Sequence, residues 1–288
     1  MINRYFTNKT AKIFVLVSGS ISFIILLAIG IFTFIEGLPA FQEIGLLDFL
    51  FGTEWRPGQE QYGILPMIIG SVYVTIGSML MAIPLGIACA ILLAEVAPTR
   101  VRQLLRPAIE LLVGIPSVVY GLVGMLLVVP AVRQIGGTGF SVLAASIVLM
   151  AMVLPTIISV GEDSLRAAQG YKEGALAMGA TQWQTIWHVL VPAARSGIMA
   201  GVILGMGRAI GETMAMIMVI GNSITFPTSP LDPARTLTGN IAVEIMYATG
   251  IHANALFATG VVLFVLILAL NSIAIIALKR GVSTQYVG

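Results

Sequence analysis

The sequence predicts an all-α membrane protein with six transmembrane helices. Hydrophobic residues make up 58% of the 288 positions and charged residues only 10%, whereas a soluble domain carries about 25% charged residues. The hydrophobic residues gather into runs of about 20 or more, the length that a helix needs to cross a bilayer. A soluble globular fold is therefore excluded. The expected spans are 13–35, 62–94, 111–132, 140–161, 196–222 and 254–278.

Composition also excludes several classes of function. The net charge of +2 is too small to indicate a nucleic-acid partner. Cys89 is the one cysteine, which rules out a disulfide framework, and His188 and His252 have no neighbouring Cys or His to complete a metal site. Only Lys9 precedes a hydroxyl residue, and no glycine lies upstream of it, so no nucleotide-binding loop is present. We expect no metal, no cofactor and no catalytic residue.

The first span carries no charge over 23 residues and follows Arg4, Lys9 and Lys12. A cleaved signal peptide opens in a similar way, but its apolar core is only about 7–15 residues long. We therefore expect a retained transmembrane helix. The segment 36–61 after it is polar, acidic and rich in turn residues, and we expect it to form a loop.

Proline and glycine mark irregularities in the next three spans. Pro84 should kink the second span, and Pro155 lies within the fourth. The third contains Gly114 and Pro116, which should disturb its helix. Two interpretations stay open, a simple kink or a broken backbone, which survives at membrane depth only if it is buried in protein or lines a cavity. The segment 95–110 between the second and third spans is expected to be a short loop.

The fifth span carries two charged residues, Arg208 and Glu212. In one continuous helix, their four-residue spacing puts both on one face. A charge at mid-bilayer costs about 2.5–3.5 kcal/mol on insertion scales, so the presence of two charged residues in this span requires a structural or functional explanation. One interpretation is an ion pair that holds neighbouring helices together; the other is a polar spot on a path for an ion.

Lysine and arginine are distributed unevenly between the two sides. With six spans, both termini lie on one side, which collects eleven of these residues, against three (Arg56, Arg133 and Arg235) on the other. Because cytoplasmic loops carry the excess of positive charge, both termini and the loop 162–195 are predicted to be cytoplasmic. The outer loop that precedes the sixth span is expected to hold a short interfacial helix near 234–247.

The cytoplasmic loop contains EGALAMGATQWQTIWHVLVP, beginning at Glu173. Glu173, Ala175 and Gly179 are predicted to lie on a short helix and the turn after it, and Pro192 lies at the return to the membrane. Small residues leave this helix little side-chain bulk, so it can lie deep in a groove of another protein. An amphipathic helix resting on the lipid surface is the alternative.

This pattern of Glu173, Ala175, Gly179 and Pro192 resembles the ATPase-coupling motif of ABC importer permeases. The family form has two alanines after the glutamate, and Gly174 replaces the first of them here. The resemblance implies the type I, MetI-like permease fold. The permease domain would cover 62–280. A first helix and outer loop (1–61) would precede it and a short cytoplasmic tail (281–288) would follow.

Longer stretches resemble the phosphate permease subunit of the PstC kind; these are GTEWRPGQEQYGILP at 52–66, IELLVGIPSVVYG at 109–121 and GRAIGETMAMIMVIGN at 207–222. The resemblance implies a subunit that translocates inorganic phosphate across a prokaryotic plasma (inner) membrane and has no ATPase activity of its own. It also implies two copies of a phosphate ABC ATP-binding subunit, a sister permease of the PstA kind and an extracytoplasmic phosphate-binding protein. Homodimer and heterodimer pairings look alike from one chain.

The family's membrane arginine and glutamate, tied to phosphate passage, fall on Arg208 and Glu212. A guanidinium suits phosphate oxygens, whereas an ionised carboxylate only accepts hydrogen bonds. We hypothesise that Glu212 accepts from the P–OH group, which sulfate lacks; the rival view is that it neutralises Arg208 between turnovers. Ser117 and Thr213 are candidate hydroxyl contacts, together with amides exposed by a disturbed backbone at 114–117.

Two other classes of function remain as alternatives. An ion-coupled secondary carrier would show inverted repeats, and the sequence shows no internal repeat. A membrane subunit that transports nothing would leave Arg208 and Glu212 as a packing pair. Within the importers, another oxyanion such as molybdate is the main competing substrate.

Overall fold

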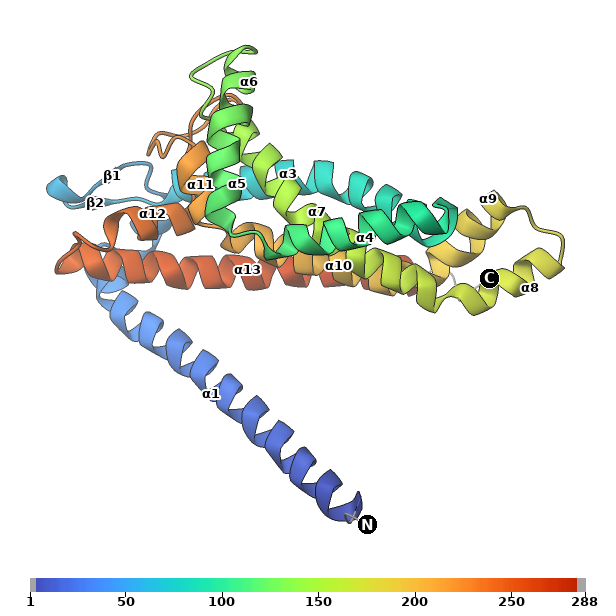
Figure 1. Ribbon diagram of the computed structural model, residues 1–288. Helices are drawn as coiled ribbons and strands as arrows, with labels where there is room; N and C mark the ends of the chain where they lie inside the picture. Colours follow the sequence, from blue (N-terminus) through green and yellow to red (C-terminus); the bar gives the residue numbers. More distant parts are fainter. Residues whose placement is uncertain (1–3, 284–288) are drawn as a thin grey trace.

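The computed structural model describes residues 4–283, and side chains from residue 12 to residue 276. The described chain is almost entirely helical (Figure 1). Its α-helices are α1 (Arg4–Glu43), α2 (Leu46–Phe51), α3 (Leu65–Ile91), α4 (Thr99–Gly114), α5 (Ser117–Val123), α6 (Val129–Arg133), α7 (Val142–Ala167), α8 (Gln169–Ala177), α9 (Gln182–Thr185), α10 (Val191–Gly211), α11 (Met214–Val219), α12 (Leu237–Glu244) and α13 (Ile251–Ser283).

Shorter elements join these helices. Strands β1 (Trp55–Arg56) and β2 (Gln61–Tyr62) form one antiparallel hairpin, in which Trp55 pairs with Tyr62, around a 3₁₀ turn at Pro57–Gln59. Three π-helical turns extend or connect α-helices: Leu92–Val96, Gly124–Val128 and Ile186–Leu190. The predicted tail at 281–288 falls mostly outside the described residues, since the description ends within α13 at Ser283.

Five helical stretches of the described chain are long and apolar enough to cross a membrane, or six if one bent pair counts as a single span. The bent pair is Thr99–Gly114 and Ser117–Arg133, with 101° between its halves. The expected disturbance at Gly114 and Pro116 is therefore confirmed, and it is a full break. The first, second, fourth and sixth predicted spans agree with stretches whose bounds differ by up to eight residues. The fifth, predicted at 196–222, is misplaced, because its helical stretch runs from Gln182 to Gly211 and the chain breaks at Glu212.

The prediction of a short loop at 95–110 is wrong, because α4 begins at Thr99. Its arginines suggested a loop, but two of them bond to backbone oxygens and to carboxylates of the protein. Arg102 donates to the backbone oxygens of Leu93 and Ala94 at 2.7 and 3.0 Å, which are carbonyls near the end of a helix. Arg106 pairs with Asp163 of α7 at 3.2 Å. A charged helix thus lies against the base of α3 and α7.

The prediction of a loop throughout 36–61 is also wrong, because α1 continues to Glu43 and α2 and the hairpin follow. Packing on α13 explains the longer helix. A Cβ on Gly37 would lie 2.8 Å from the backbone nitrogen of Ala258, so the two backbones nearly touch there. Asn254 also donates to the backbone oxygen of Glu36 at 2.7 Å. A short helix, α12, is present within the predicted range 234–247.

Helix α7 is the centre of the molecule and packs between α3 and α10. Glycines allow the close approach: a Cβ on Gly86 of α3 would lie 2.6 Å from Ile157 of α7, and one on Gly205 of α10 would lie 2.7 Å from Val153. Small residues at such contacts are typical of membrane helix packing, because lipid gives no hydrophobic force between helices. These three helices form a frame on which the breaks and loops are placed.

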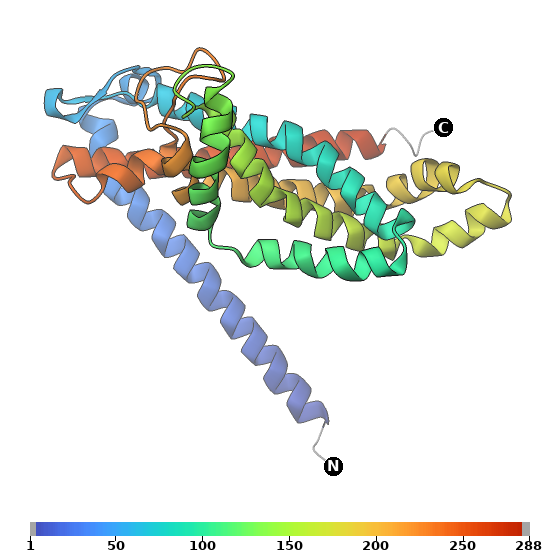
Figure 2. The same cartoon turned by 45° about the horizontal axis from the view of Figure 1, so that its top comes forward.

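The hairpin and α12 lie at one end of this frame, and α8 and α9 lie at the other (Figure 1). Helix α1 packs on α13 toward its own C-terminal end, and its N-terminal part diverges from the body. Figure 2 shows the same divergence from a second direction. In this single chain the most apolar window of α1 is fully exposed.

We predict that Gly221→Ala destabilises the outer end of the protein. Gly221 has φ +92°, and a Cβ there would lie 2.7 Å from the Cβ of Pro233. The left-handed backbone costs about 1–2 kcal/mol and the overlap about 1–3 kcal/mol. Thermal unfolding of the detergent-purified protein should show a clear fall in melting temperature. Gly19→Ala is the control, since nothing lies within 4 Å of its Cβ position; equal melting temperatures for the two variants would contradict the prediction.

Candidate functional site

Two helices are interrupted in the membrane part of the chain. The first break is at Ile115 and Pro116, whose backbones are extended (ψ 128° and 139°). The second is at Glu212, also extended (ψ 129°), between α10 and α11. Each break leaves the chain to restart as a new helix, α5 or α11.

The two restarted helices lie side by side and run in the same direction. A Cβ on Gly121 of α5 would lie 2.9 Å from the Cα of Ala215, and one on Gly124, just beyond α5, would lie 3.0 Å from Val219. Residue numbers therefore rise in the same direction along α5 and α11, which means that the two helices are parallel. Their first residues, Ser117 and Met214, accordingly lie at the same end, and the two breaks meet at one level.

Arg208 lies one turn before the second break and is half-buried. Within the residues whose side chains are described, its guanidinium forms no ion pair or hydrogen bond. It acts electrostatically on the hydroxyl of Tyr120, and this hydroxyl donates to the backbone oxygen of Leu112 at 2.9 Å across the first break. The arginine of one broken helix thus lies within electrostatic range of the residue that bridges the break of the other.

The prediction that Arg208 and Glu212 share one helix face is wrong, because α10 ends at Gly211. Glu212 instead caps the next helix: its Oε1 accepts from the amide of Ala215 at 3.3 Å, a group that the first turn of a helix leaves free. Its backbone oxygen accepts from the hydroxyl of Thr238 in α12 at 3.0 Å. The Glu212 side chain therefore caps α11 instead of lying one turn from Arg208 on a continuous helix, and it forms no ion pair with Arg208.

Ser117 and Thr213 occupy equivalent places at the two breaks. Ser117 is the first residue of α5 and is half-buried. Thr213 precedes α11, and its hydroxyl donates to the backbone oxygen of Gly211 at 3.2 Å. The four predicted path residues are therefore brought together around the two breaks. Ser117 also begins the long helical stretch to Arg133, so its free amides and dipole favour negative charge there.

The short helix and turn predicted within 162–195 are confirmed. Glu173 and Ala175 lie on α8, and Gly179 has φ +88° in the turn after it. The amide of Gly179 donates to the oxygen of Leu176 at 3.0 Å, which closes the helix end. Pro192 is the second residue of α10 and directly follows the π-helical turn Ile186–Leu190, within one helical stretch that runs from Gln182 to Gly211. We call the segment Gln169–Thr185, from α8 through α9, the coupling segment.

The coupling segment exposes large apolar side chains at the end of the molecule. Met178 is 88% exposed and Trp183 61% exposed. Tyr171 and Trp187, the latter just after the segment, are also exposed. Exposed apolar groups gathered at one end are typical of a surface that contacts another protein or lipid. Their place agrees with a docking role for the motif.

Glu95 was missed by sequence reasoning, which placed it in a loop. It lies in the π-helical turn after α3, and its side chain is completely buried. Its carboxylate accepts from Lys172 Nζ at 2.6 Å and from Gln169, and its backbone oxygen accepts from Gln182 at 3.2 Å. One residue therefore holds both helices of the coupling segment to the frame helix α3. An acidic residue at the end of an apolar run was the one available signal.

A second missed cluster ties the outer segments together around Glu244 of α12. Its carboxylate accepts from Trp55 Nε1 at 2.8 Å and pairs with Arg235 at 2.5 Å and with His252 at 2.9 Å. Arg235 also donates to the backbone oxygen of Asn222 at 3.1 Å. This network fixes the hairpin, the outer loop, α12 and α13 to one another.

Residues 82–281 match the family described as binding-protein-dependent transport system inner membrane component. The chain belongs to this family. It is therefore a membrane component of a transport system and not itself an enzyme.

Relatives and solved structures agree with this membership. The chain is 47% identical over 248 residues to the probable ABC transporter permease protein YqgH of Bacillus subtilis (strain 168), covering 83% of this chain and 80% of the relative. It is 38% identical over 266 residues to the phosphate transport system permease protein PstC of Xylella fastidiosa (strain 9a5c), covering 85% and 82%. A solved inward-facing MetNI methionine ABC transporter matches with a TM-score of 0.54 and 21% identity, over 75% of this chain and 93% of that one. This likeness confirms the type I, MetI-like fold.

We predict that Glu95→Ala loosens the coupling segment. Removing the buried carboxylate deprives Lys172 and Gln169 of their acceptor, and a polar group left without its partner is costly. Hydrogen exchange of the amides in 169–190 should become about tenfold faster, which corresponds to about 1.4 kcal/mol of lost protection. Glu110→Ala is the control, because its pair with Arg106 is exposed. Equal exchange in the wild type and the Glu95 variant would contradict the assigned role.

Proposed function

We propose that this chain is the membrane-spanning permease subunit of an ATP-driven ABC importer that carries inorganic phosphate into the cytoplasm. The phosphate transport permeases among its relatives support the substrate. Its placement in a prokaryotic plasma membrane, with both termini cytoplasmic, is supported by its family and by the distribution of lysine and arginine.

The observation that carries the proposal is Arg208, a half-buried arginine without an anionic partner in the described chain. A charge inside a membrane segment is expensive and usually marks an ion path. The guanidinium lies beside the break at Ile115 and Pro116, where Ser117 opens a helix that favours negative charge. Arg208 therefore binds phosphate oxygens in passing, and the Ser117 and Thr213 hydroxyls add contacts. Binding is weak, because a conducting site must also release its ion.

Glu212 supplies discrimination in this proposal. Its Oε1 is engaged by the amide of Ala215, which leaves Oε2 to accept a hydrogen bond from the P–OH group of phosphate. A fully ionised sulfate has no such proton and meets a bare carboxylate, which disfavours it. The capping bond also keeps this carboxylate at the break in every turnover.

Energy comes from partner subunits. Two copies of an ATP-binding subunit serve the complex, and one of them docks on the coupling segment through Glu173, Ala175 and Gly179. Pro192 fixes the return of the chain into α10. A sister permease of the PstA kind completes the channel, and an extracytoplasmic binding protein delivers phosphate. Movement of α8 reaches the membrane because Glu95 joins the coupling segment to α3.

We predict that Arg208→Met abolishes most phosphate uptake while the complex still assembles. A hydrogen bond to a charged group is worth about 1.5–3 kcal/mol, so uptake in proteoliposomes should fall about 10–100-fold. Arg133→Met is the control, since Arg133 is an exposed arginine of the outer end. If the Arg208 variant took up phosphate at the wild-type rate, the role of this arginine would be packing, and the proposed path would be wrong.

We also predict that Glu212→Gln weakens the choice of phosphate over sulfate. Glutamine keeps an oxygen for the amide of Ala215 but presents an NH₂ donor where the carboxylate accepted. Competition of sulfate with labelled phosphate uptake should therefore become stronger by about tenfold, which corresponds to about 1.4 kcal/mol. Unchanged preference in this variant, with normal assembly, would assign discrimination to another part of the system.

A further inference from the structure

A pocket of about 460 Å³ lies where the coupling segment meets the rest of the chain. Four elements line it: the π-helical turn after α3, the beginning of α4, the end of α7, and α8. We call it the cationic pocket, since three of its lining side chains carry a positive charge. Its lining residues are Ala94, Glu95, Arg102, Arg166, Gln169 and Lys172.

The positive groups of the cationic pocket reach solvent, whereas the negative groups beside them are buried. The side chains of Arg166 and Lys172 are 33% and 24% exposed. Their partners are Glu162, which is 3% exposed, and Glu95, which is completely buried. With Arg102 included, three cations stand against two carboxylates. An ion that enters the pocket from water therefore meets the cations first.

Each cation of the pocket keeps donors that the described residues leave unused. Arg102 donates from Nε and Nη2 to two backbone oxygens of the π-helical turn, and Arg166 donates from the same two atoms to Glu162. Neither Nη1 forms a hydrogen bond with a described residue. Lys172 donates to Glu95, which employs one of the three N–H groups of its ammonium. Such unused N–H groups suit the oxygens of a phosphoryl group.

The cations of the pocket are held in place before any ligand arrives. Both guanidinium groups are fixed by two hydrogen bonds each. The carboxylate of Glu95 fixes Lys172 and Gln169 together. Long basic side chains on an open surface lose rotamer freedom when they bind, and these side chains have already lost it. Preorganisation of this kind strengthens binding, and it distinguishes the pocket from a patch of mobile surface lysines.

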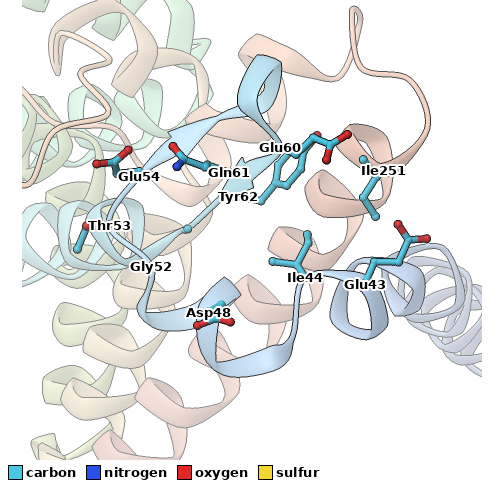
Figure 3. Close-up of a pocket in the computed structure, with 11 residues that line it drawn as sticks. Glu43, Ile44, Asp48, Gly52, Thr53, Glu54, Glu60, Gln61, Tyr62 and Ile251 are labelled. Carbon is cyan, nitrogen blue, oxygen red and sulfur yellow. The ribbon is translucent and has the colours of Figure 1, made fainter.

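The hollow at the other end of the chain has the opposite charge. Figure 3 shows Glu54, Glu60, Asp48 and Glu43 spaced around it. None of the described residues that line it is a lysine or an arginine. An anion is repelled by such a surface. Of these two pockets, only the cationic pocket therefore suits an anion.

We propose that the cationic pocket binds a phosphoryl anion, which joins α8 to α4 and α7. Two sources present this group at a membrane surface: the headgroup of an anionic phospholipid and free inorganic phosphate. Basic pockets between membrane helices commonly bind such headgroups on the cytoplasmic side. A lipid would make the site a lasting anchor of the coupling segment. Free phosphate would make it a sensor of the transported product, and this reading alone rests on the proposed function.

The bound anion stabilises the coupling segment, because it attracts Lys172 of α8 and two arginines of the frame and α4 at the same time. Hydrogen exchange of the amides in the coupling segment measures this stabilisation. The experiment uses the full complex, with its sister permease and ATP-binding subunits, in nanodiscs and without nucleotide. The permease carries Arg208→Met, so that the proposed path adds no second phosphate site.

Two arms distinguish the sources of the anion. In nanodiscs of net-neutral phosphatidylcholine, inorganic phosphate at about ten times its Kd should slow the exchange about tenfold if free phosphate is the ligand. If a lipid is the ligand, exchange should slow by a similar factor when phosphatidylglycerol replaces phosphatidylcholine, with no phosphate added. Potassium chloride at the same ionic strength should have no such effect, since it only screens charge.

Two double variants test whether the response comes from the cationic pocket. Glu162→Gln with Arg166→Gln removes one cation together with its buried partner, and Glu95→Gln with Lys172→Gln does the same for α8. Each should weaken the Kd about tenfold, which leaves only about twofold slowing at the same probe concentration. Arg100→Gln is the control, because Arg100 is an exposed arginine of α4 that does not line the pocket; it should keep the full response.

Three results would overturn the proposal: no slowing by phosphate or by phosphatidylglycerol, a slowing that chloride reproduces, or a full response in both double variants. Failure of the proposed function would look different. If the complex with Arg208 intact took up no phosphate while the coupling segment still responded through the cationic pocket, the anion site would stand and the proposed substrate would be wrong.

Discussion

The structure depends on one constraint, that backbone groups exposed by a broken helix inside a membrane must find partners within the protein. The breaks at Pro116 and Glu212 meet this constraint in different ways. Tyr120 bridges the first with its bond to Leu112. At the second, Glu212 holds the amide of Ala215 and Thr238 holds the oxygen of Glu212. Of these three side chains, Glu212 is also one of the residues proposed to contact phosphate.

Close packing of α5 and α11 fixes the two breaks relative to each other. Gly121 allows the contact, because a side chain there would overlap Ala215 and Met218. This contact places the start of one helix beside Arg208 of another and leaves the guanidinium without an internal counter-ion. The carboxylate of Glu212 is engaged by the amide of Ala215 instead.

The frame of α3, α7 and α10 links this site to both ends of the molecule. At one end, Glu95 ties the coupling segment to the helical stretch of α3 through Lys172 and Gln182. At the other end, Glu244 ties the hairpin to α12 and α13.

The spans, the break at Gly114 and Pro116 and the helix of the coupling segment could be predicted from the sequence, because apolar run length, proline and glycine act locally. The break at Glu212 could not, since no proline marks it and its capping bond competes with a regular i,i+4 pattern. Glu95 was missed because its partner Lys172 is 77 residues away, and the bond from Trp55 to Glu244 was missed because it spans 189 residues. Helix α4 was misjudged because its arginines bond to carbonyls that only the fold brings near.

The central claim is that the two breaks border a water-filled anion path. In a Cys89→Ser background, Ser117→Cys or Thr213→Cys would introduce the single thiol, to be treated with a small membrane-impermeant thiol reagent during ATP-driven turnover. The account predicts rapid labelling at both positions, slowed by phosphate and not by sulfate. Thiols that stay unlabelled, or label at a rate indifferent to phosphate, would mean a dry contact between helices and would contradict it.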